Sequence, residues 1–285
     1  MRRYPCALLR GLLGAAGGLL GLFVAAISTA HFEYDSSANV TLVITSCNRP
    51  NSLLALLESM LQRNQFKFRS VLVAEASGRP SVNEAVVRRF PELTYLSCAA
   101  RRSQVENIDT AYATLATPYI LHFEEDWLVF RTGFVERSLR LLERYPNVSV
   151  VSLHNVGENE WQQVDEALEG GAGLMKRDLR GGWGYFTWGA GLRRLADYRD
   201  IGSNYMQYNH TWKSNAQLQA EARSEGVGIK KHFIHREWKI NWLMKARGFR
   251  VALFNDTQVL GPYAKHAPMD KEKHVPDEKG ASPFE

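Results

Sequence analysis

The chain has 285 residues, of which 45% are hydrophobic, and a formal net charge of +5 at pH 7. This composition supplies enough apolar material for a large folded domain, and three cysteines are too few for a small disulfide-stabilised scaffold. Arg2, Arg3 and Arg10 account for three of the surplus positive charges, so the remaining sequence carries no basic arm or patch that would favour nucleic acid.

The N-terminus contains a charge-free segment, residues 11–30, that is rich in Leu, Ala and Gly. Its length suits one transmembrane helix, and the arginines before it predict that residues 1–10 are cytoplasmic. The alternative is a cleaved signal peptide that ends in the small residues 28–30. In either case we expect the remaining chain to enter the secretory lumen. With an uncleaved anchor, the protein would be a single-pass type II protein of the ER or Golgi membrane, with residues 31–38 as a short stem.

The sequence holds possible glycosylation sites and two further cysteines. Four Asn-X-Ser/Thr triplets match the acceptor pattern for N-glycosylation, although such triplets also arise by chance. Cys47 and Cys98 follow predicted strands that need not be neighbours, so we expect free thiols. The four triplets begin at Asn39, Asn147, Asn209 and Asn255.

From residue 40 onward, short β-branched runs alternate with segments of helical periodicity. The predicted strands cover residues 40–45, 70–74, 93–98, 119–123 and 148–153. One predicted helix starts at Pro50, and three more cover residues 82–90, 108–116 and 133–145. This alternation predicts an α/β fold with a mostly parallel sheet flanked by helices.

The second half is less regular. Residues 157–181 are polar and rich in glycine, which favours a mobile loop. Helices are expected at 211–225 and 235–247 and a last strand at 251–254. We assign residues 39–262 to one domain with two halves, 39–153 and 154–262. Residues 263–285 are predicted to be a polar tail.

Polar residues gather where the predicted strands end, at 46–49, 75–77 and 124–126. In parallel sheets, ligands bind outside these carboxyl ends. The acidic triplet Glu124, Glu125 and Asp126 follows a buried strand, where carboxylates are costly unless a cation meets them. A divalent cation that carries a phosphorylated ligand would meet them, whereas a solvated turn is the simpler alternative.

Three segments resemble one group of enzymes. They are Val40-Thr-Leu-Val-Ile-Thr-Ser-Cys-Asn-Arg-Pro50, then Ala116-Thr-Pro-Tyr-Ile-Leu-His-Phe-Glu-Glu-Asp126, and last Arg236-Glu-Trp followed by residues 245–254. In order and spacing they resemble the nucleotide-sugar glycosyltransferases of the GT-A (Rossmann-like) fold, most closely the inverting family 2. The second segment resembles the strand that ends in that family's metal-binding "DXD" motif.

The resemblance implies a Mn²⁺ or Mg²⁺ ion bound to the donor diphosphate. Asp126 is its expected ligand, supported by Glu124 or Glu125 directly or through water. Glu124 stands where the family more commonly has Asp, which places the carboxylate one methylene further out. His266 is a further expected ligand, and His274 is the alternative.

The resemblance also implies that residues 39–153 bind the nucleotide and residues 154–262 the acceptor, with donor contacts on the loops that follow the strands. Short polar side chains would meet the ribose or base, and a guanidinium can pair with phosphate. After the second strand the family often has Asp-Asp-Gly-Ser, whereas this chain has Glu75-Ala-Ser77. The expected donor-binding residues are Thr45, Ser46, Asn48, Arg49, Glu75 and Asp109.

On the acceptor side, Glu237 stands where the family commonly carries its catalytic base, at the start of a late helix. Simple stabilisation of a helix N-terminus is the competing interpretation, and Glu221 and Glu225 are alternative bases. Trp183 and Trp188 are expected to bind the acceptor, because a sugar stacks on aromatic rings, although such residues also form core.

These inferences predict a metal-dependent hexosyl- or N-acetylhexosaminyltransferase. It would move a sugar from a nucleotide-sugar, with UDP as the expected nucleotide, to a glycan or glycoprotein hydroxyl with inversion. One alternative is a catalytically silent sugar-binding or scaffold protein with the same fold. Another is a nucleotidyltransferase, although its Gly-rich first loop is missing at residues 46–50.

Overall fold

The computed structural model describes residues 31–154, 164–176, 184–206 and 236–267. They belong to one compact unit that begins at His31, and the predicted transmembrane segment 11–30 lies outside them. Within the described ranges, the helices are too short or too polar to span a bilayer.

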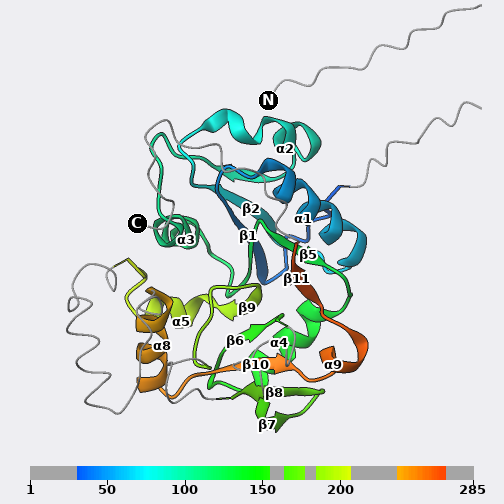
Figure 1. The fold of residues 1–285 in the computed structure, drawn as a ribbon, viewed down its shortest axis with the longest axis vertical. Helices are drawn as coiled ribbons and strands as arrows, with labels where there is room; N and C mark the ends of the chain where they lie inside the picture. Colours follow the sequence, from blue (N-terminus) through cyan, green and yellow to red (C-terminus); the bar gives the residue numbers. More distant parts are fainter. Residues whose placement is uncertain (1–30, 155–163, 177–183, 207–235, 268–285) are drawn as a thin grey trace, which may run out of the picture. The chain divides into compact units, whose positions relative to one another are not determined.

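The first half of this unit forms four parallel strands in the order β3-β2-β1-β4 (Figure 1). Helices connect consecutive strands, as parallel pairing requires. The strands are β1 (Val40–Ser46), β2 (Ser70–Glu75), β3 (Thr94–Leu96) and β4 (Tyr119–Glu124). The connecting helices are α1 (Pro50–Arg63), the short η1 (Pro80–Asn83) with α2 (Glu84–Arg89), and α3 (Gln104–Ala113).

The second half continues the same nine-stranded sheet in the order β9-β6-β10-β8-β7. β9 is antiparallel to both β4 and β6, and β6 and β10 therefore run in the same direction as β4. These strands are β6 (Val148–Ser152), β7 (Val164–Leu168), β8 (Ala172–Met175), β9 (Gly191–Arg194) and β10 (Arg250–Phe254). The helices are α4 (Phe134–Arg144), α5 (Leu195–Asp200), α8 (Arg236–Ala246) and α9 (Thr257–Leu260).

A separate two-stranded ribbon pairs β5 (Trp127–Val129) with β11 (Ala264–His266) in antiparallel register. β5 directly follows the acidic triplet, and β11 is the last described strand. The ribbon therefore brings the end of the described chain to the carboxyl end of β4.

Two apolar clusters cover the two faces of the sheet. In β1, Leu42 and Ile44 belong to one cluster and Val43 to the other, as the alternation of side chains along a strand requires. Helices α1, α2 and α4 contribute to the first cluster, and α3, α5 and α8 contribute to the second. The domain is thus a mixed α/β sheet between two helical layers, and the predicted fold class is confirmed for the described residues.

Three local predictions need correction. Helix α3 was predicted to begin at residue 108. It begins at Gln104, because Ser103 and Glu106 form a capping box. Within the predicted loop, residues 164–175 form the β7–β8 hairpin. The ends of the domain also extend beyond 39–262, since Phe32 packs on Phe90 and Tyr263 is 1% exposed. The helix predicted at 211–225 lies outside the described residues.

Candidate functional site

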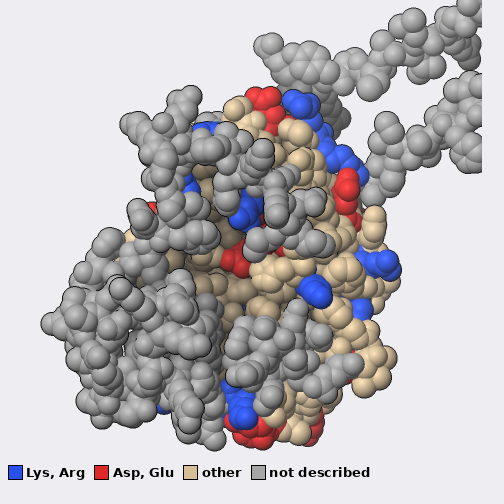
Figure 2. All heavy atoms as spheres, in the orientation of Figure 1, with Lys and Arg blue, Asp and Glu red and all other residues tan. Residues whose placement is uncertain are grey.

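The loops that follow β1, β2 and β4 meet at one edge of the sheet. The register pairs Thr45 with Glu124 and Ser46 with Glu75, so the three strands end side by side. Figure 2 shows acidic and basic side chains close together near the middle of the view. The predicted convergence of polar loops is therefore present.

Arg49 links the first loop to the acidic triplet. Its Nη1 lies 3.2 Å from Asp126 Oδ2 and 3.6 Å from Glu125 Oε1. Asn48 before it has a positive φ of 58°, a conformation that Asn tolerates, and Pro50 after it starts α1. The Asn-Arg-Pro turn thus places the guanidinium over the end of β4.

Glu75 joins the loops after β1 and β2. Its Oε1 accepts hydrogen bonds from the backbone N–H groups of Asn48 at 3.0 Å and Ser77 at 2.9 Å. Its Oε2 accepts one from Asn83 Nδ2 at 3.2 Å. These contacts give Glu75 a structural task, and a direct donor contact by this residue stays a prediction.

Asp126 faces His266 across the β5–β11 ribbon. His266 Nδ1 lies 3.4 Å from Asp126 Oδ1, and the backbone N–H of Ala267 donates to the Asp126 carbonyl at 2.6 Å. Apart from this His266 nitrogen, the buried Oδ1 has no hydrogen-bond partner among the described residues. Burial alone would raise the pKa of Asp126, but His266 and Arg49 outweigh it and lower the pKa below its ordinary value. Asp126 is therefore a carboxylate with one oxygen available to a cation.

Trp127 forms the wall behind this pair. Its ring is 1% exposed and lies 4.1 Å from the His266 ring, centroid to centroid. The buried ring of His154 contacts the same indole edge-on at 4.9 Å. Trp127 was not among the expected site residues, although its position directly after the acidic triplet could have pointed to it.

The other two acids of the triplet are more enclosed. Burial raises the pKa of Glu124, which accepts hydrogen bonds from Gln104 Nε2 and from Trp127 Nε1 at 3.4 Å. Burial raises the pKa of Glu125 to about 8 despite the nearby Arg49. Gln104 was also missed, because α3 was predicted to start later; the Ser-x-x-Glu pattern at 103–106 could have revealed it.

The small polar residues at the end of β1 are buried. Thr45 is 4% exposed, and its hydroxyl lies 3.5 Å from His122 Nε2. The Ser46 hydroxyl and the Asn107 amide oxygen have no hydrogen-bond partner among the described residues. Two unsatisfied acceptors beside the loops are consistent with a polar ligand there.

Asp109 lies on α3 and holds the segment around residue 205. Its carboxylate accepts hydrogen bonds from the Tyr198 hydroxyl at 2.8 Å and from the backbone N–H groups of Tyr205 and Met206, both at 2.9 Å. These hydrogen bonds give Asp109 a structural role that requires no ligand. Its contact with the donor stays a prediction.

The predicted acceptor residues are only partly described. Trp188 is 7% exposed and packs edge-on against Phe186 at 4.9 Å and Tyr205 at 4.8 Å, which favours the core interpretation. Glu237 is the second residue of α8, as predicted, but its side chain and all of Trp183 lie outside the described residues.

The metal prediction can be tested against the donor atoms present. A carboxylate oxygen and an imidazole nitrogen face each other at Asp126 and His266, and both suit Mn²⁺, whereas Mg²⁺ prefers the oxygen. The described residues contain no group of three or more potential ligands, so diphosphate and water would have to complete the coordination. The arrangement fits a metal that is bound together with its nucleotide.

Comparison with solved structures identifies the fold. The crystal structure of GalNAc-T7 with UDP, GalNAc and Mn²⁺ is similar to this chain, with a TM-score of 0.55 and 11% identity over 86% of this chain and 46% of that chain. A mannosyltransferase from Pyrobaculum calidifontis, in complex with GDP-Man and Mn²⁺, has a TM-score of 0.50 and 14% identity, over 78% of this chain and 59% of that chain. The chain has a GT-A fold.

The similarity to GT-A structures is limited in both length and sequence identity. The chain spans about half the length of the structures it matches, at identities that relate folds and not activities. Neither a protein-family model nor a curated protein sequence matches this chain. The comparisons therefore show the fold, and the evidence for an activity comes from the site residues.

Proposed function

We propose that this GT-A domain is a metal-dependent glycosyltransferase that uses a nucleotide-sugar, with a UDP-sugar as the first candidate. The observation that carries this proposal is the position of Asp126 between Arg49 and His266 at the carboxyl edge of the sheet. In the reaction, the bond between sugar C1 and the diphosphate oxygen breaks, and a glycan or glycoprotein hydroxyl oxygen bonds to C1. The hydroxyl proton passes to a base, and the nucleoside diphosphate leaves.

Asp126 and His266 would hold Mn²⁺ or Mg²⁺, and Glu124, whose carboxylate accepts hydrogen bonds from Gln104 and Trp127, would act through water. The ion would stabilise the negative charge that develops on the leaving diphosphate. The buried Asp126 Oδ1, which has no hydrogen bond among the described residues, supports this assignment.

Arg49 would pair with a phosphate of the donor. A guanidinium forms strong charge-assisted hydrogen bonds to phosphate, and Arg49 has 28% of its side chain exposed at this edge. The unsatisfied Ser46 hydroxyl supports a further polar donor contact, and Asn48 lies between these two residues. Glu75 would act by holding the loop that carries Asn48.

Glu237 remains our proposed base, supported by its position in the first turn of α8. Inversion at C1 rests on the resemblance to family 2, as does an acceptor platform that includes Trp183 or Trp188. The same holds for the choice between a hexosyl- and an N-acetylhexosaminyltransferase. A membrane anchor at residues 11–30 and an ER or Golgi location follow from the sequence alone.

The decisive experiment is a donor screen that measures nucleotide release from UDP- and GDP-sugars with Mn²⁺, with Mg²⁺ and with EDTA. We expect release with one donor class, abolished by EDTA and restored by Mn²⁺. Release that is indifferent to EDTA would refute the metal assignment.

A catalytically silent sugar-binding protein with the same fold is the alternative function. Equilibrium binding of the same donors separates the two functions. Saturable donor binding without release or transfer, over all donors and a panel of acceptor glycans, would establish a binding protein in place of an enzyme.

A further inference from the structure

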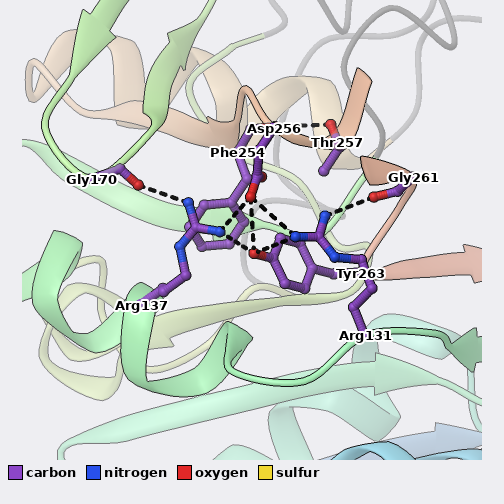
Figure 3. A network of polar contacts seen from close by, with 8 residues as sticks. All are labelled: Arg131, Arg137, Gly170, Phe254, Asp256, Thr257, Gly261 and Tyr263. Carbon is purple, nitrogen blue, oxygen red and sulfur yellow. Dashed lines mark hydrogen bonds and ion pairs between the residues drawn. The ribbon is translucent and has the colours of Figure 1, made fainter. Parts of the chain in front are cut away.

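Two arginines converge on one aspartate beside the β5–β11 ribbon (Figure 3). Asp256 Oδ2 accepts hydrogen bonds from Arg137 Nη1 at 2.7 Å and Arg131 Nη2 at 3.1 Å. The Tyr263 hydroxyl lies in the same group, 3.4 Å from Asp256 Oδ2 and 3.2 Å from Arg131 Nη2, and also meets Arg137. We call these four residues the Asp256 cluster.

The cluster connects segments that are distant in sequence. Arg131 Nη1 donates to the Gly261 carbonyl at 2.9 Å, and Arg137 Nη2 donates to the Gly170 carbonyl at 2.7 Å. The Arg131 guanidinium stacks over the Tyr263 ring at 4.0 Å. One group of side chains therefore fixes the end of β10, the β7–β8 turn, α4 and both sides of the ribbon.

The ribbon needs such support. Each of its strands has three residues, and a two-stranded ribbon of this length is not stable by itself. Arg131 follows β5 by two residues, and Tyr263 directly precedes β11. The cluster therefore holds the two strands at the ribbon end opposite to Asp126 and His266.

The position of His266 depends on this register. Ala264 pairs with Val129 and His266 pairs with Trp127, while the Phe130 N–H donates to the Tyr263 carbonyl at 2.9 Å. A slip by one residue would turn the imidazole to the opposite face of the ribbon. The buried Tyr263 side chain, 1% exposed, is the fixed point nearest to that strand.

We propose that the Asp256 cluster is a positioning device that sets the register of β11 and thereby holds His266 against Asp126. Its members do not contact the reacting atoms, so they would act only through the ribbon. The proposal rests on the proposed function to the extent that His266 binds a metal.

The test uses the full chain with Asp256→Asn and Tyr263→Phe. The second variant removes a single hydroxyl and keeps the buried ring, so it remains informative if the first does not fold. Asp165→Asn is the matched control, because Asp165 forms a 2.7 Å ion pair with Arg250 that is not part of the ribbon. Asp256→Glu tests rescue by a retained carboxylate.

Two quantities are measured: amide hydrogen exchange, and binding of Mn²⁺ with UDP by electron paramagnetic resonance. We expect a larger loss of protection at the N–H groups of Phe130 and Ala267 than in β1 and β4, where exchange should rise only by the loss of global stability. We also expect Mn²⁺ affinity to fall by about tenfold, the lower end for residues that support metal ligands. Asp165→Asn should change neither quantity, and Asp256→Glu should recover part of both.

Equal loss of protection throughout the sheet would overturn the proposal, because it would indicate a purely structural cluster. So would faster ribbon exchange with unchanged Mn²⁺ affinity. If the wild-type protein bound no Mn²⁺ and transferred no sugar, the proposed function would fail. The exchange pattern would then decide by itself whether the cluster sets the ribbon register.

Discussion

Asp126 and Asp256 occupy equivalent places in the fold but differ in the charges of their neighbouring side chains. Each follows by two residues a strand of the same direction, β4 or β10, at the same edge of the sheet. Asp126 shares its surroundings with two other acids and has one arginine, Arg49. Asp256 meets two arginines and a tyrosine hydroxyl.

The difference shows how charge balance separates a candidate binding site from an anchor. At the triplet, three carboxyl groups share one guanidinium, and burial raises the pKa of Glu124 and Glu125, so their ionised forms need positive charge that a bound cation can supply. Two guanidiniums on one carboxylate leave no such need, and the cluster fastens chain segments together. Strand position alone therefore does not identify a metal ligand, whereas the neighbouring charges distinguish the two cases.

The largest effect is expected from Asp126→Asn. The change removes the proposed metal ligand and should lower transfer by about a hundredfold or more, since metal stabilisation of a leaving group is worth several kcal/mol. Stability should stay within about 1 kcal/mol, because Arg49 is partly exposed. Nucleotide release and urea unfolding measure the two quantities. Undiminished transfer by this variant, with Asp165→Asn as the control, would remove Asp126 from the mechanism.

For Asp256→Ala we expect the reverse of the Asp126→Asn result: the main loss should be in the free energy of unfolding. Breaking a fully buried ion pair costs about 3–5 kcal/mol, and the partial exposure of this cluster reduces our expectation to about 2 kcal/mol. Arg131 and Arg137 keep 22% and 21% of their side chains exposed. The expected result is a lower urea midpoint with an unchanged slope. An unchanged midpoint would mean that the cluster contributes no net stability.

The sequence predicted one side of this comparison better than the other. The loops at Arg49 and Asp126 follow apolar strands that alternate regularly with helices, so their convergence could be inferred from local patterns. The Asp256 cluster joins residues that are more than a hundred positions apart, such as Arg131 and Asp256, and no local pattern reports such pairing. For the same reason Tyr263 was assigned to a tail, although it is buried.

The pH dependence of stability also distinguishes the Asp126 region from the Asp256 cluster, through the titration of Glu125. Burial raises its pKa from 4.5 to about 8, so between these values the folded chain keeps a proton that the unfolded chain releases. Stability therefore falls as pH rises through this range, and Glu125→Gln abolishes that loss. The lowered pKa of Asp256 acts in the opposite sense, because its contribution is lost only as pH falls below its ordinary value of 3.8.

We expect Glu125→Gln to gain stability relative to wild type, on the order of 1–2 kcal/mol, between pH 6 and pH 8. Urea unfolding in EDTA measures the difference between the two proteins, in which the other titrating groups cancel. Parallel pH profiles would show that Glu125 is ionised in the folded chain. Asp256→Asn serves as the control and should follow the wild-type slope over this range.

The smallest effect is expected at Glu169, which pairs with Arg144 near the Asp256 cluster. The two side chains are 59% (Arg144) and 67% (Glu169) exposed, so water and salt screen their attraction. Glu169→Gln should change stability by less than about 0.5 kcal/mol, although the neighbouring Gly170 carbonyl is held by Arg137. Urea unfolding at low and high salt, beside Asp256→Asn, measures this. A loss as large as that of Asp256→Asn would mean that burial is not what makes the Asp256 cluster an anchor.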